Sequence, residues 1–173
     1  IGNALTQIRE LPFKPGEGDE WVKVGSLKLR IDGGLLYGTA YLREPYLQPG
    51  GAKFYEIPNP ESRGELMTPA TDILAIIRAG HLAGWQMSSH VAGDAGVDVV
   101  LDALEILDRE SPIASRRYNL IHAYLPNAGT ASRAAKLGVF VDTQPMWYYK
   151  DGDSLVETIG PERSRHMIGL NDW

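Results

Sequence analysis

Residues 85–107, WQMSSHVAGDAGVDVVLDALEIL, contain a short apolar run that ends in a histidine, a glycine turn and an amphipathic segment. The first part predicts a short strand that ends at His90. Apolar residues then recur at helical spacing from Val97 to Leu107, so we expect a helix over 95–109 with one buried face. A strand followed directly by a helix is the repeating unit of α/β proteins.

The same pattern recurs along the chain. Further strands are predicted over 20–31, with a break or bulge at Gly25, over 118–125, and over the apolar run 138–145 that Pro145 halts. Thr68 is expected to cap a helix that has Pro69 in its first position, and other helices are expected over 129–137 and after Gly160. This alternation predicts a parallel sheet, either doubly wound or closed as a (β/α)8 barrel, with ligands at the carboxyl ends of its strands.

Composition narrows the class of protein. The chain has 173 residues, enough for one domain, with a net charge of −5 and scattered basic residues. No apolar run approaches the ~18 residues of a membrane span and no secretory signal opens the chain, so we expect a cytoplasmic protein with neither a membrane nor a nucleic-acid partner. The chain begins at Ile1, which suggests an excerpt or a processed product of a longer protein.

Residues 35–66 are rich in glycine, proline and aromatic residues and show little periodicity. A long segment of this kind inside a compact domain is typical of a lid, an insertion or a binding loop. The aromatic cluster MWYY at 146–149, which includes Trp147, fits either the lining of a substrate pocket or simple packing of a loop.

Four polar residues fall near the carboxyl ends of the predicted strands, namely Lys28, His90, His122 and Gln144. Because the chain has no cysteine, a metal has to be held by histidine, carboxylate or modified lysine. Neutral imidazole is a common metal ligand, whereas lysine can bind a metal only after carbon dioxide converts its amine to a carbamate. A hydrogen-bonded structural histidine and a solvated lysine are the alternatives for these positions.

Other chemistries have weaker support. His81, in an amphipathic helix, and His166, in the polar tail, are interpreted as structural. No G-x-S-x-G motif is present, so Ser88 and Ser89 are read as small strand residues rather than nucleophiles. The GDAG stretch at 93–96 is a weak match to a phosphate-binding loop.

Several segments together resemble one known family: LKLRIDGG at 27–34, LREPY at 42–46, AGWQMSSHVAGDAGVDVVLDALE at 83–105 and LGVFVDTQPMW at 137–147. In order and spacing they resemble the middle of the metal-dependent amidohydrolase superfamily, in the branch of N-substituted formamide deformylases and exoenzyme-regulatory-protein-like hydrolases. The resemblance implies part of a TIM (β/α)8 barrel, about strands four to seven. It also implies one or two divalent metals, with zinc expected, and a water that attacks an amide-type C–N bond of a small molecule.

The resemblance implies roles for individual residues. Lys28 matches the lysine of the family's K-x-x-x-D-G pattern, which is expected to be carboxylated, and His90 and His122 match the histidines that end the next two strands. Asp32, Gln144 and Trp147 are expected around the metal ligands or in the substrate pocket. Asp94 is expected either near the site or, with preference, as a helix cap.

The chain also departs from the family pattern. It has no H-x-H pair and no final strand with the aspartate that accepts a proton, and Ile121 replaces an acidic residue before His122. No catalytic proton acceptor is therefore assigned. Four barrel strands leave two unpaired edges, so we expect the chain to pair with the missing part of a barrel or to self-associate. A catalytically incomplete half-barrel and a metal-free α/β binding domain remain as alternatives.

Overall fold

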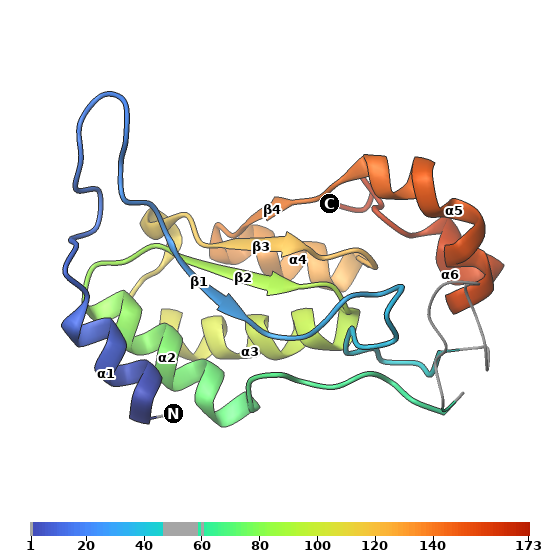
Figure 1. Cartoon of the computed structure of the whole chain (residues 1–173), viewed down its shortest axis with the longest axis horizontal. Helices are drawn as coiled ribbons and strands as arrows, with labels where there is room; N and C mark the ends of the chain where they lie inside the picture. The colour runs from blue at the N-terminus through green and yellow to red at the C-terminus, as the bar shows by residue number, and fades with distance from the viewer. Residues whose placement is uncertain (1, 47–58, 60) are drawn as a thin grey trace.

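The computed structural model describes residues 2–46, 59 and 61–173, and its centre is a parallel sheet of four strands (Figure 1). The strands are paired in the order β1-β2-β3-β4, with bounds Leu27–Arg30, Met87–Val91, Asn119–His122 and Phe140–Asp142. Part of the lid predicted over 35–66 lies outside the described residues, namely 47–58 and 60.

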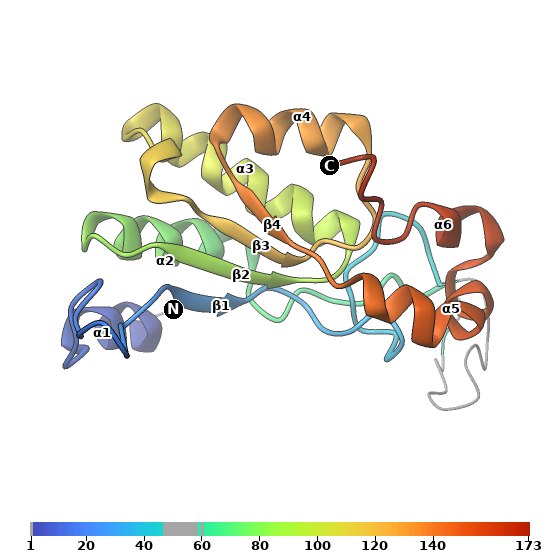
Figure 2. The ribbon, with the colours of Figure 1, turned by 90° about the horizontal axis from the view of Figure 1, so that it is seen from above.

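Helices follow the strands and cover one face of the sheet (Figures 1 and 2). This layer consists of α2, α3 and α4, with α1 beside α2, and α5 and α6 lie beyond the carboxyl ends of the strands. The bounds are α1 Gly2–Glu10, α2 Ala70–Leu82, α3 Asp94–Glu110, the 3-10 helix η1 Ala114–Arg116, α4 Ala128–Leu137, α5 Pro145–Ile159 and α6 Pro161–Arg165. The prediction of successive parallel β/α units that form part of a barrel is confirmed.

The main core lies between the sheet and its helices. Side chains alternate along each strand, so one set, including Leu27, Met87 and Leu120, packs on the helix layer. Their partners are the apolar stripe of α3, in which Leu101 and Leu104 are at most 2% exposed. On the opposite face of the sheet, Lys28 and Arg30 are exposed and alternate with the partly buried Leu27 and Leu29.

The strand predicted over 20–31 is much shorter than expected, since β1 covers only Leu27–Arg30. Residues 16–24 instead turn back on themselves, with hydrogen bonds in both directions between the strands of a small hairpin. At its tip Asp19 accepts the backbone N–H groups of Trp21 and Val22. Figure 1 shows this hairpin projecting from the amino-terminal end of β1. The apolar alternation of WVKVG therefore belongs to a hairpin and not to the sheet.

One helix prediction and one strand prediction also need correction. Thr68 does not cap α2: its hydroxyl donates to the carbonyl oxygen of Arg30 at 2.7 Å, and Pro69 occupies the cap position. The strand predicted over 138–145 is shorter than expected, since only Phe140–Asp142 pair with β3. Pro145 then starts α5, because its missing N–H is not needed in the first turn of a helix.

None of the helices in the part of the chain that the structure describes combines the length and the apolar character needed to cross a bilayer.

Replacing Leu104 by alanine should lower the free energy of unfolding by about 2–5 kcal/mol, because it opens a cavity between α3 and the sheet. Urea denaturation followed by far-UV circular dichroism measures the change. The matched control is Leu82→Ala, at a side chain that is 74% exposed, which should change stability by less than about 0.5 kcal/mol. Equal losses in the two variants would contradict the location of the core.

Candidate metal centre and substrate cavity

Two of the predicted ligands lie side by side. The imidazole rings of His90 and His122 have centroids 4.6 Å apart and meet edge to face at 78°. The strand register alone does not produce this contact, because Ile121 is the residue paired with His90, and His122 is paired with the buried Val91. The backbone of His122 and Ala123 adopts φ values of +85° and +44°, which ends the regular alternation at the last residue of β3.

The ring of His122 is oriented by two neighbours. Its Nδ1 lies 2.7 Å from Oε1 of Gln144 and 3.0 Å from the hydroxyl of Tyr124. The amide nitrogen of Gln144 donates to the carbonyl oxygen of Asp142 at 2.6 Å, which leaves Oε1 facing the histidine as an acceptor. Nδ1 is therefore the protonated nitrogen, and Nε2 keeps a free lone pair. Gln144 thus lies directly beside a candidate ligand.

His90 has a less satisfied environment. Its Nδ1 is buried without a hydrogen-bond partner in the described structure, and it lies 3.9 Å from Oδ1 of Asp32. Burial, and then the charge of His122, lower the pKa of His90, and burial lowers the pKa of His122 as well. Both imidazoles are therefore neutral near pH 7, which is the form that binds a metal.

Asp32 connects three segments behind His90. Its fully buried carboxylate accepts the backbone N–H groups of Tyr41 at 2.9 Å, Ala92 at 2.8 Å and Gly93 at 2.8 Å. Burial raises the pKa of Asp32 to about 6, against the opposing effect of these donors. The carboxylate holds the end of β1 to the turn between β2 and α3.

Asp94 does not cap α3, whose cap position is Gly93. Its Oδ1 accepts the backbone N–H of Arg43 at 2.9 Å and that of Ala95 at 3.0 Å. The side chain of Arg43 also forms an ion pair with Asp98, with Nε 2.6 Å from a carboxylate oxygen. The preferred cap role is therefore wrong, and Asp94 attaches the segment around Arg43 to the start of α3.

Lys28 is an exposed residue on the sheet face that also carries His90. It pairs with Ser88, two residues before His90, and its positive charge contributes to the lowered pKa of both histidines. Within 2–46, 59 and 61–173, no three His, Cys, Asp or Glu side chains gather in a metal-binding arrangement. Two neutral imidazoles fit a divalent metal as part of a ligand set, and Lys28 fits only as an added carbamate oxygen donor.

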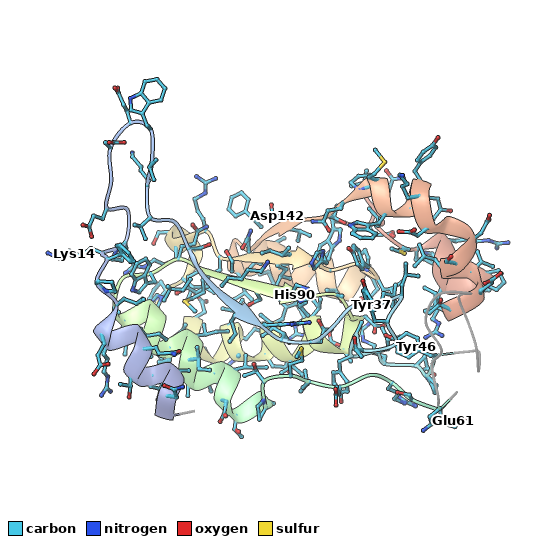
Figure 3. All side chains as sticks on the ribbon, in the orientation of Figure 1. Lys14, Tyr37, Tyr46, Glu61, His90 and Asp142 are labelled. Carbon is cyan, nitrogen blue, oxygen red and sulfur yellow. The ribbon has the colours of Figure 1, made fainter. Side chains whose placement is uncertain are left out.

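A cavity of about 430 Å³ opens above the two histidines, at the carboxyl ends of β2 and β3. Figure 3 shows His90 on β2 with Tyr37 on the segment that follows β1. Trp147 lies in the cavity wall, whereas Lys28, Asp32, Asp94 and Gln144 do not line it. The lining residues are Gly33, Gly34, Leu35, Leu36, Tyr37, His90, Ala92, His122, Tyr124, Trp147, Lys150, Asp151, Ser154, Leu155 and Met167.

Two parts of the cavity were not predicted from the sequence: the position of Tyr124 beside His122, and the cavity wall that α5 forms. The spacing of Trp147, Lys150, Asp151 and Ser154 was the available signal, since it places them on one side of a helix. The two histidines interpreted as structural lie elsewhere: His81 is buried and bonded to Tyr118 and Ser111, and His166 is exposed.

The chain belongs to the amidohydrolase family, whose model matches residues 1–172. It is 29% identical over 162 residues to the protein LONG AFTER FAR-RED 3 of Arabidopsis thaliana, covering 92% of this chain and 26% of that protein. It is 28% identical over 145 residues to YtcJ of Bacillus subtilis (strain 168), named as an amidohydrolase, covering 84% of this chain and 25% of that protein. The chain thus spans about a quarter of the length of these curated relatives.

Solved structures show the same fold. A metal-dependent hydrolase from Pyrococcus furiosus superposes with a TM-score of 0.75 and 29% identity, over 95% of this chain and 31% of that one. A second, from Pyrococcus horikoshii OT3, superposes with a TM-score of 0.77 and 23% identity, over 98% of this chain and 31% of that one. The P. furiosus protein is similar to this chain in both fold and sequence, whereas the P. horikoshii protein supports the fold alone.

Replacing Asp32 by alanine should lower the free energy of unfolding by roughly 2–4 kcal/mol, because it leaves two buried backbone N–H groups and one part-buried N–H group without an acceptor. Urea denaturation measures the loss. The control is Asp19→Ala, since Asp19 also accepts backbone N–H groups but lies in the exposed hairpin, where water replaces it. A loss in Asp32→Ala no larger than that in the control would contradict the connecting role of Asp32.

Proposed function

We propose that this chain supplies part of the metal centre of a hydrolase that cleaves amide-type C–N bonds of small molecules with a metal-activated water. The observation that carries the proposal is the contact between His90 and His122, two neutral imidazoles at the floor of a cavity. Membership of the amidohydrolase family supports it, as does the likeness to the P. furiosus protein, which is named a metal-dependent hydrolase.

The proposed ligands are Nε2 of His122, the ring of His90 and Lys28 as a carbamate, with zinc as the expected ion and one or two ions bound. A divalent ion of this kind lowers the pKa of a bound water to about 7 and polarises a carbonyl group. Gln144 and Tyr124 hold the His122 ring in the tautomer that presents Nε2. No described carboxylate joins both histidines in a cluster, so we propose that the proton acceptor comes from another part of the protein.

The overall reaction is the addition of water across the C–N bond. The water oxygen bonds to the carbonyl carbon, the C–N bond breaks, and the nitrogen leaves as an amine that takes up a proton. The leucine side chains of the cavity, Leu35, Leu36 and Leu155, keep bulk water away from this centre. Low polarity strengthens the electrostatic interactions on which the cleavage depends.

We also propose that the open face of the sheet packs against the remaining β/α units of a barrel. Support comes from the exposed side chains on that face, including Lys28, Arg30 and Phe140, the last of which is 49% exposed. Within the described residues, β1 and β4 each have one unpaired edge, which a closed barrel would occupy.

Replacing His90 or His122 by alanine in the full-length protein should remove most of the bound metal and the hydrolysis of N-formyl and N-acetyl amines. Inductively coupled plasma mass spectrometry measures the metal, and release of the amine measures turnover. His166→Ala is the matched control, because His166 is exposed and is not among the residues that line the cavity. Full metal content in both variants, or equal loss in the control, would overturn the proposed centre.

Replacing Gln144 by alanine should weaken metal affinity by about 10- to 100-fold without unfolding the protein, because Nδ1 of His122 loses the acceptor that sets its tautomer. Competition with a chromogenic chelator measures the affinity. Gln86→Ala is the control, since Gln86 bonds to the carbonyl oxygen of Arg117 away from the cavity. Unchanged affinity in Gln144→Ala would show that the amide does not orient the ligand.

A further inference from the structure

One wall of the cavity is a single side of α5. Trp147, Lys150, Asp151, Ser154 and Leu155 line it, at spacings that bring them together on a helix. Neighbouring residues of the same helix, including Asp153 and the 84% exposed Tyr149, are outside the lining. The helix therefore presents one defined set of side chains to whatever enters the cavity.

The remaining walls are mostly apolar. The segment after β1 contributes Leu35, Leu36 and Tyr37, and Met167 contributes from beyond α6. Besides the two neutral histidines, the lining residues include two charged side chains, Lys150 and Asp151. A ligand that enters this cavity is thus placed between an apolar surface and a charged helix face.

Asp151 is the more constrained of the two charged groups. Its side chain is partly buried, and its carboxylate makes no hydrogen bond or ion pair with any described residue. Its charge reaches the Tyr124 phenol: burial first, and then Asp151, raise the pKa of Tyr124 to about 12. The Tyr124 hydroxyl in turn contacts His122, so the charge of Asp151 acts on a group beside the candidate ligands.

A ligand that fills the cavity raises the desolvation free energy of the Asp151 carboxylate. A ligand displaces the water that solvates it, and a carboxylate in apolar surroundings is tolerated only when it is paired. Lys150 does not carry the same penalty, since its side chain is exposed and its long stem can keep the ammonium group in water. The unpaired charge that a ligand has to match is therefore negative.

We propose that Asp151 determines specificity by binding a protonated amine at the end of the substrate that is remote from the scissile amide. The proposal rests on the function proposed above. The substrate class is an amide in which an apolar spacer joins the scissile nitrogen to a second, protonated amine. Leu35, Leu36 and Leu155 contact the spacer, and Trp147 adds an aromatic face on which a cation is stable. Hydrolysis yields a carboxylic acid and a diamine, and the remote ammonium group is unchanged.

A matched series of substrates tests this specificity in the full-length, metal-loaded protein. The probes are N-acetyl-1,5-diaminopentane, N-hexylacetamide and 6-acetamidohexanoate, which share a spacer and end in ammonium, methyl and carboxylate. The wild-type kcat/KM should be at least about tenfold higher for the ammonium probe than for the methyl probe. Asp151→Asn should reduce that ratio by about 10- to 100-fold, the effect of losing a charge-assisted hydrogen bond.

Two further variants sharpen the test. Asp151→Lys should favour the carboxylate probe over the ammonium probe. Asp153→Asn removes the same charge from the same helix, outside the cavity lining, and should leave the ratio as in the wild type. A wild-type preference for the methyl or carboxylate probe, or an equal ratio in wild type and Asp151→Asn, would overturn the proposal.

A binding measurement separates this proposal from the proposed function. Calorimetry with pentane-1,5-diamine on the metal-free protein should give binding that Asp151→Asn weakens about tenfold or more. If this binding is found while no amide is hydrolysed, the recognition by Asp151 is supported and the hydrolase function fails. If amides are hydrolysed but the diamine does not bind, the hydrolase function is supported and the recognition by Asp151 fails.

Discussion

A single buried carboxylate holds the arrangement on which the site depends. Asp32 accepts N–H groups from residues 9, 60 and 61 positions further along the chain. Those bonds require close packing of backbone: a Cβ at Gly93 would lie 2.0 Å from the carbonyl oxygen of Tyr41, and one at Gly96 would lie 3.0 Å from Asp32. The glycines of GDAG therefore allow a turn to approach a carboxylate, and this explains a motif that resembled a weak phosphate loop. His90 is positioned two residues before this turn.

Secondary structure could be predicted from the sequence wherever the spacing of apolar residues matches the face that the element buries. The strand ending at His90 and the helix after it are apolar at spacings that match their packing, and both are present. The prediction over 20–31 was wrong because alternation also occurs in a hairpin, and only Asp19 and the turn distinguish the two. Helix α5 was missed because its aromatic residues are exposed or line a cavity instead of forming a core stripe.

For the site, the sequence located candidate ligands but not their geometry. Strand ends placed His90 and His122 near one another, and the amide of Gln144 was expected beside them. The positive φ values of His122 and Ala123 have no local signal, since neither residue is glycine or asparagine. The same is true of the contact that replaces the expected cap at Asp94, because its partner, Arg43, is 51 residues away in the chain.

The left-handed backbone at the end of β3 has a consequence for how the protein is made. Such a conformation costs on the order of 1–3 kcal/mol per residue and persists only where neighbouring structure holds it. The ring that this backbone carries is held by Gln144, which lies 22 residues later. During synthesis at about 5–20 residues per second, the histidine leaves the ribosome roughly one to four seconds before its acceptor does. The ring of His122 is thus oriented only when the amino end of α5 arrives, so this part of the candidate site is completed after the strand that carries it.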